Sequence, residues 1–284
     1  MSNFSLVNNT SSSASQTSLA STSAKLNKTL QRLSSGLRIN RSGDDAAGLA
    51  IANSFRSDVS VLSQGVRNAN DGLSTLQIID GGLNTISGLL DRAASLAAQS
   101  ASGTFAGDRD TLQAELSKVL TEVSRQAQNI GLGGAAATPE GKYNTSIGVY
   151  IGGGATAAAT GNEVSVDLSN SRVDTTGLAI GAIDIGTTAG VVGAKAAITA
   201  IKDAVATLGE VQGKVGAGQN NLTQAIDLAT AQITNFQAAE SAIRDADVAQ
   251  EASNMARLAT LQQAGVSALA QANQSSQALL ALLR

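Results

Sequence analysis

Two long segments with a seven-residue apolar repeat flank a glycine-rich middle, and this pattern most constrains the fold of the chain. Apolar residues alternate spacings of four and three from Phe55 to Leu76, and they fall on every seventh position from Leu208 to Ile243. Such spacing is typical of helices that pack side by side in a coiled coil. We therefore predict a mainly α fold, in which the N- and C-terminal segments form a long antiparallel coiled-coil rod.

Local signals divide the rod into helices. Asp44 and Asp45 stand where a helix needs a cap and negative charge in its first turn, so we interpret them as a helix start and not as an acid/base pair. A helix over about 44–100 follows, and a turn near 102–108 leads to a second helix from Leu112 to Ile130. Helix is predicted again from Val191.

The middle of the chain has a different period. Apolar residues alternate with small or polar ones over 147–151 and again over 164–168, which predicts a small β-hairpin. For 172–190 we predict a loop with short strand pieces. The expected organisation is a terminal helical domain (1–40 with 245–284), a helical rod domain (41–130 with 191–244) and a small hairpin insertion (131–190).

Both ends of the chain lack charge. The first 24 residues and residues 258–283 carry no Lys, Arg, Asp or Glu, yet the second run contains many amides and hydroxyls, which argues against membrane insertion. Amphipathic tails without charge fit segments that fold against neighbouring copies. The expected subunit-interface residues are Leu19, Leu26, Leu30, Leu33, Leu37, Met255, Leu258, Leu261, Val266, Leu269, Leu280 and Leu283.

Composition excludes several functions. The chain has no histidine and no cysteine, which removes the commonest general base and the thiolate ligand. A net charge of −3 argues against a nucleic-acid partner. The run Gly152 to Gly154 is not followed by the Lys-Ser/Thr of a phosphate loop. We expect no catalytic residue, metal or cofactor. The N-terminus has no basic and apolar signal segment, so we expect export by another route.

Long motifs at both ends resemble those of bacterial flagellins. At the N-terminal end they are 30–40 (LQRLSSGLRIN), 44–52 (DDAAGLAIA) and 67–72 (RNANDG). At the C-terminal end they are 243–247 (IRDAD), 251–255 (EASNM), 261–265 (LQQAG) and 270–274 (AQANQ). The resemblance covers roughly 20–130 and 205–284.

The resemblance implies a short flagellin without large outer domains, which self-polymerises into the extracellular flagellar filament for swimming. In that family the terminal helices form an inner tube and the rod helices a surrounding one. The implied partners are other copies of the chain, the flagellar export apparatus, the filament cap and a cytoplasmic chaperone that masks the C-terminal segment, here about 245–284.

An animal innate immune receptor is a further partner that the resemblance implies. Arg92, Leu96, Gln99 and Glu115 match the contact pattern of recognised flagellins. Two other functions stay open at this point. A hook–filament junction protein would share weaker versions of these termini, and a secreted membrane-active translocator would bind liposomes through its tails.

Overall fold

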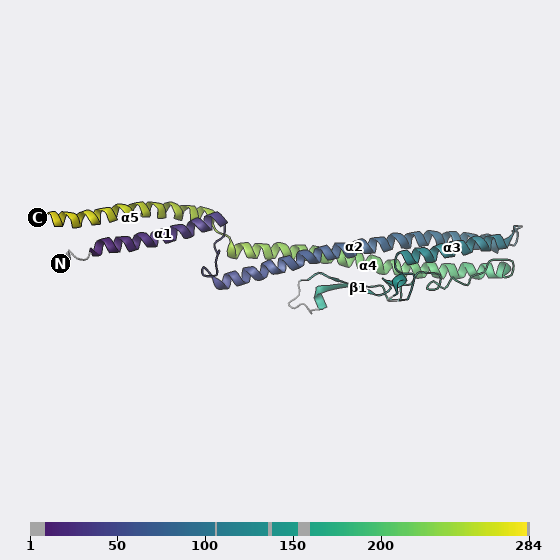
Figure 1. Cartoon of the computed structure of the whole chain (residues 1–284). Helices are drawn as coiled ribbons and strands as arrows, with labels where there is room; N and C mark the ends of the chain where they lie inside the picture. Colours follow the sequence, from purple (N-terminus) through teal and green to yellow (C-terminus); the bar gives the residue numbers. More distant parts are fainter. Residues whose placement is uncertain (1–8, 106, 136–137, 153–159, 283–284) are drawn as a thin grey trace. The chain divides into compact units, whose positions relative to one another are not determined.

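The computed structural model describes residues 9–105, 107–135, 138–152 and 160–282, except for the side chains of 160 and 275–282. The predicted fold class is confirmed, because long helices dominate and a small antiparallel sheet is inserted between them (Figure 1). The elements in chain order are α1 (Thr10–Ser35), α2 (Ala46–Ala101), α3 (Arg109–Asn129), η1 (Pro139–Gly141), β1 (Ser146–Tyr150), η2 (Thr160–Asn162), β2 (Glu163–Asp167), α4 (Gly190–Arg244) and α5 (Val248–Leu282).

The chain forms two compact units. Residues 1–57 with 235–284 make up one, which we call the terminal unit, and residues 58–234 make up the other, which we call the rod unit. The terminal unit takes in the start of α2 and the end of α4, where the rings of Phe55 and Phe236 stack with centroids 5.6 Å apart. It therefore extends past the boundaries at 40 and 245 that we expected from the sequence.

Side-chain caps determine where helices begin. Asn9 and Asp108 each accept a first-turn backbone N–H, at the starts of α1 and α3. Asp45 does the same for α2, since its Oδ1 accepts the N–H of Gly48 at 2.9 Å. At the other end of α1, Gly36 takes the left-handed conformation that commonly terminates a helix.

In the rod unit, α2 and α4 run antiparallel, as the shared seven-residue period predicted (Figure 1). The contacts join Gly72 to Leu222, Leu76 to Gly218 and Asn84 to Gln212. α3 adds a third helix and buries Leu112, Leu116, Leu120, Val123 and Ala127. With a third layer present, side chains such as Leu83 and Leu90 are fully enclosed.

The β-hairpin lies directly on the helices of the rod unit. β1 pairs with β2 in antiparallel register, with Gly148 opposite Ser165. A Cβ at Gly65 of α2 would overlap the carbonyl of Ile151, and one at Gly218 of α4 would press on Val166. The absence of a side chain at these glycines therefore lets the hairpin approach the helix backbones.

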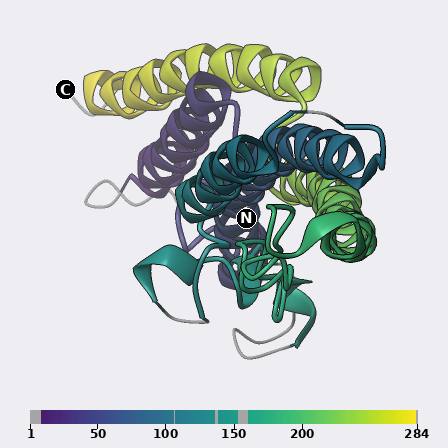
Figure 2. The same cartoon turned by 90° about the vertical axis from the view of Figure 1, so that its right-hand side faces the viewer.

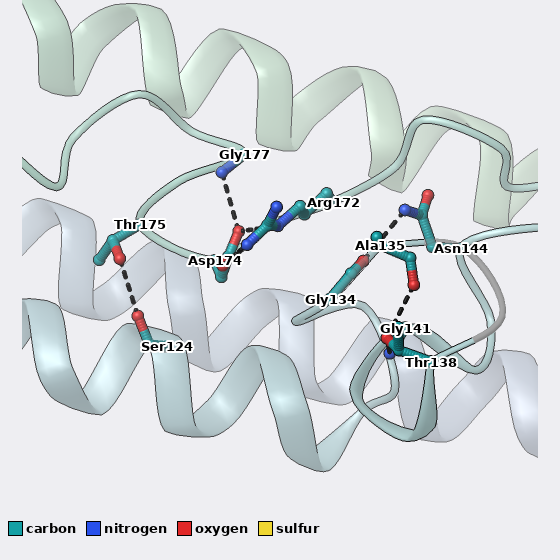
Figure 3. Close-up of polar contacts among 10 residues, drawn as sticks. All are labelled: Ser124, Gly134, Ala135, Thr138, Gly141, Asn144, Arg172, Asp174, Thr175 and Gly177. Atoms are coloured by element: carbon teal, nitrogen blue, oxygen red, sulfur yellow. Dashed lines mark hydrogen bonds and ion pairs between the residues drawn. The ribbon is translucent and has the colours of Figure 1, made fainter.

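The prediction of short strand pieces in 172–190 is wrong, because 172–189 forms turns, bends and irregular segments with no strand. Side-chain hydrogen bonds, and not strand pairing, hold this segment (Figure 3). The carboxylate of Asp174 binds the Arg172 guanidinium and accepts the N–H of Gly177 at 2.8 Å, and the hydroxyls of Ser124 and Thr175 lie 2.9 Å apart. Figure 2 shows the segment between α3 and α4 on one side of the rod-unit helices.

Candidate assembly interface

The terminal unit contains a pair of helices, α1 and α5, with a continuous seam. α1 and α5 lie side by side and antiparallel (Figure 1). The inward positions of both helices alternate spacings of three and four, as in a coiled coil. On α1 they are Ser12, Ser15, Leu19, Thr22, Leu26, Thr29 and Leu33, and on α5 they are Glu251, Met255, Leu258, Gln262, Gly265, Leu269 and Ala272.

Amides and hydroxyls bond across this seam where the sequence lacks charge. Gln262 Nε2 donates to Ser23 Oγ at 3.2 Å, and Ser12 Oγ donates to Asn273 Oδ1 at 2.9 Å. The two helices approach each other closely midway along the seam, where Gly265 faces Leu19. A Cβ added at Gly265 would lie 3.2 Å from Leu19 Cδ1. The uncharged ends thus satisfy part of their polar groups within one chain.

The base of the helix pair is held by backbone bonds and ion pairs. Ala246 N donates to Gly36 O at 2.9 Å, which ties the end of α1 to the start of α5. Arg32 Nη1 lies 3.2 Å from Glu251 Oε1, and Lys28 Nζ lies 2.6 Å from Asp44 Oδ1. The hydrogen bond from Lys28 is the main cause that lowers the pKa of Asp44. Bonds from two backbone N–H groups add to this effect, and desolvation opposes it.

Two helices cannot enclose their own apolar residues. Among the described side chains of the terminal unit, only Thr29, Ile39, Ala52 and Glu251 are buried. The seam leucines remain half-buried because no third element covers them. Full burial of one leucine is worth about 1.5–3 kcal/mol, so this unit gains free energy from any surface that completes it.

The structure separates the predicted interface residues into two groups. Three of them point away from the seam and are exposed, namely Leu30 at 43%, Leu261 at 51% and Val266 at 54%. Those at the α1–α5 seam or its base are half-buried, namely Leu19, Leu26, Leu33, Leu37, Met255, Leu258 and Leu269. The side chain of Leu280 and the whole of Leu283 lie outside the described residues.

Two exposed apolar residues of the terminal unit were missed in the sequence. Ile51 is 49% exposed near the start of α2, and Val248 is 57% exposed at the start of α5. Both stand outside the leucine stripes from which the interface was predicted. A search for apolar residues off the stripe, next to predicted caps, would have found them.

Comparison with known proteins identifies the family. The bacterial flagellin N-terminal helical region matches residues 6–135, and the flagellin C-terminal helical region matches residues 198–283. The flagellar filament 33 kDa core protein of Treponema phagedenis is 33% identical over 97% of this chain and 98% of its own length. The chain belongs to the bacterial flagellin family.

Other flagellins give similar matches. The flagellin of Halalkalibacterium halodurans is 36% identical over 90% of this chain and 91% of its own. The crystal structure of Bacillus cereus flagellin aligns with a TM-score of 0.46 and 27% identity, over 61% of this chain and 94% of that one. The named relatives do not favour a junction protein or a translocator. No helix in the described ranges is long and apolar enough to span a membrane.

The residues with the flagellin receptor pattern lie on α2 and α3 of the rod unit. Arg92 and Glu115 form an ion pair between the two helices, and Gln99 is exposed. Leu96 is only 2% exposed, because it packs inside the helix bundle. Its side chain has no free surface to offer, so any receptor contact falls to the other three residues. That contact stays a prediction.

Within the described part of this flagellin-family chain, no group of three or more His, Cys, Asp and Glu could hold a metal ion. The groove between α3 and the 175–183 turn is lined largely by hydroxyl and amide groups. Several of them are already bonded, including Gln113, which bonds to the backbone of Ile183 and Ile185.

Proposed function

We propose that this chain is a structural subunit that polymerises into the flagellar filament, and that completion of the terminal unit by neighbouring copies drives assembly. The observation that carries the proposal is the contrast between the two units: the rod unit encloses its core, whereas the terminal unit leaves its seam half-covered. Filament and flagellin names among the relatives support the same function. Contacts repeated between identical subunits without ring closure produce a helical filament.

The outward apolar residues provide the sharpest test. Val266→Asp changes an exposed side chain, so the helix pair should persist, but a carboxylate placed against a neighbouring copy would be unpaired and costs several kcal/mol. Seeded elongation of the purified full chain should stop or slow strongly. Val192→Asp is the matched control, since it makes the same change at an 80% exposed valine of the rod unit.

Two outcomes would contradict the proposal. One is normal elongation of Val266→Asp together with a block by Val192→Asp, which would show that the exposed apolar face of the terminal unit is not part of the contact. The other is normal filament growth after deletion of 245–284, since that deletion removes α5 and with it one side of the seam. Leu269→Asp places a carboxylate in the seam itself. It should block growth because the charge is unpaired and because the α1–α5 seam is disrupted.

Export and location follow from the same assignment. We propose that the chain leaves the cell through the flagellar export apparatus without a cleaved signal peptide, and polymerises beneath a filament cap. A chaperone that masks 245–284 would prevent premature association of the exposed Leu261 and Val266. Co-purification of a cytoplasmic partner with the wild type but not with Val266→Asp would test this role.

Recognition by an animal innate receptor is the last element of the proposal. Arg92, Gln99 and Glu115 are the accessible members of the predicted contact set. Gln99→Ala removes one of them without breaking the Arg92–Glu115 ion pair, and should weaken receptor activation. Unchanged activation by Gln99→Ala and by Arg92→Ala would exclude this surface. We do not propose an enzymatic activity for this chain.

A further inference from the structure

Charge is distributed unequally between the two units. The terminal unit carries nine Lys and Arg against six Asp and Glu, whereas the rod unit carries ten against sixteen. A chain with a formal charge of −3 therefore combines a basic part with a strongly acidic one. Opposite charges on separate parts of identical subunits favour contacts between unlike parts, in addition to any contacts between like parts.

The positive charge of the terminal unit gathers in an open groove of about 290 Å³ between α1 and α5. Four cations line it, Lys25, Lys28, Arg32 and Arg257, with Glu251 as the single carboxylate. Apart from charged and amide side chains, the groove is lined by Leu258 and the buried Thr29. The groove is thus a basic depression beside the apolar seam.

Ion pairs among the described residues neutralise only part of this charge. Lys28 pairs with Asp44, and Arg32 pairs with Glu251. Among the described residues, Arg257 donates only to the neutral Asn254, at 3.0 Å. Lys25 is exposed and makes no ion pair in the described part of the chain. The groove therefore has two cations for which a carboxylate from outside would be the natural partner.

The acidic unit presents such carboxylates. Exposed acidic residues stand on both of its long helices, at Asp58, Asp71, Asp91, Asp203, Glu210 and Asp227. We propose that the basic groove of one copy docks carboxylates of the rod unit of a second copy. This inference rests on the proposed filament function and adds the polarity of the contact: a terminal unit selects a neighbouring rod unit by charge.

Seeded elongation of the full-length protein tests the contact. Lys25→Glu reverses a charge with no ion pair to lose, so helix content and monomer melting should stay unchanged. Elongation in about 50 mM NaCl should slow by about threefold or more, because reversal of an interfacial charge acts on association rate. Lys118→Glu, the same change on an exposed α3 residue of the rod unit, is the control and should elongate close to the wild-type rate.

Salt separates an electrostatic contact from damage to packing. The ratio of wild-type to Lys25→Glu rates should approach one as NaCl rises to about 0.5 M, since screening shortens the reach of exposed charges. A ratio that does not fall with salt, or Lys25→Glu elongation at the wild-type rate, would overturn the proposal. Lys25→Gln removes the charge without reversing it, so its elongation rate should lie between those of the wild type and Lys25→Glu.

Carbodiimide cross-linking of filaments identifies the partner directly, since it joins lysine amines to carboxylates in contact. In filaments grown from mixed isotope-labelled and unlabelled copies, Lys25 should be joined to a rod-unit carboxylate of the other isotope. Cross-links confined to one copy would overturn the proposal. So would loss of binding to phosphatidylglycerol-containing vesicles by Lys25→Glu with unimpaired elongation, which would assign the groove to a lipid surface. If wild-type seeds and subunits form no filament at all, the proposed function fails, an outcome distinct from these.

Discussion

Lys28 Nζ lies 2.6 Å from the Asp44 carboxylate, which connects α1 to the turn that precedes α2. The same carboxylate accepts the backbone N–H groups of Asn40 and Arg41, each at 3.3 Å. Asp44 therefore orders the turn, while its neighbour Asp45 caps the helix. Two adjacent aspartates that look alike in the sequence have different structural roles.

The Asp44 carboxylate should make filament stability depend on pH, and Asp44→Asn should remove that dependence. The hydrogen bond from Lys28 lowers the pKa of Asp44 in the folded protein, so its contribution is fully present above the pKa of an unfolded aspartate, about 4, and is lost as pH falls through the lowered value. We expect wild-type filaments to dissociate at a higher temperature than Asp44→Asn filaments at pH 6, with the difference shrinking below pH 4. A difference that grows as pH falls would contradict this assignment.

Gly65→Ala should destabilise the rod unit by about 1–3 kcal/mol, because the new methyl group overlaps the Ile151 carbonyl and displaces the hairpin. Urea unfolding gives the free energy of unfolding, and hydrogen exchange of 146–151 reports the hairpin. Gly88→Ala on the same helix meets no atom within 4 Å and should stabilise by about 0.5–1 kcal/mol. Equal effects of the two substitutions would rule out the proposed close approach.

Ala179→Gly should stabilise the rod unit by about 1 kcal/mol. Ala179 has a φ of 55°, a left-handed conformation that is unfavourable for a residue with a Cβ. Its side chain is exposed, so little packing is lost. Ala182→Gly nearby, where φ is not positive, should be neutral or destabilising, and a gain of stability at both sites would point to an unrelated cause.

Amides of α1 and α5 should exchange faster than those of the rod unit in the unassembled protein. The seam they share is half-covered, whereas residues such as Leu83 are enclosed. Polymerisation should slow exchange in α1 and α5 by at least about tenfold, as neighbouring copies cover them. Hydrogen exchange by mass spectrometry before and after seeding measures this, and equal protection in both states would refute an incomplete terminal unit.

Much of the helical fold could be predicted because its signals are local. The helix expected over about 44–100 is Ala46–Ala101, and the hairpin expected over 147–151 and 164–168 is β1 with β2. Caps and apolar periods act over a few residues, so they are visible in the sequence. The turns of 172–189 could not be predicted, since they depend on bonds from side chains such as Asp174.

The faces of the terminal helices needed the tertiary structure. Leu26 and Leu30 belong to one leucine stripe, yet Leu26 faces the seam and Leu30 is exposed. A stripe on a helix is wider than the line of contact with one partner, so the direction of each member depends on where that partner lies. The same holds for Leu96, which matched a receptor pattern but is buried.

The sequence alone determined that this chain has long helical arms, uncharged ends and a small inserted hairpin, because periodicity, charge and capping are properties of short segments. Only the tertiary structure decided which apolar residues of α1 and α5 meet within the chain, which stay exposed, and where Gly65 contacts the hairpin. Those choices arise from contacts between residues far apart in the chain, whose geometry no local pattern records.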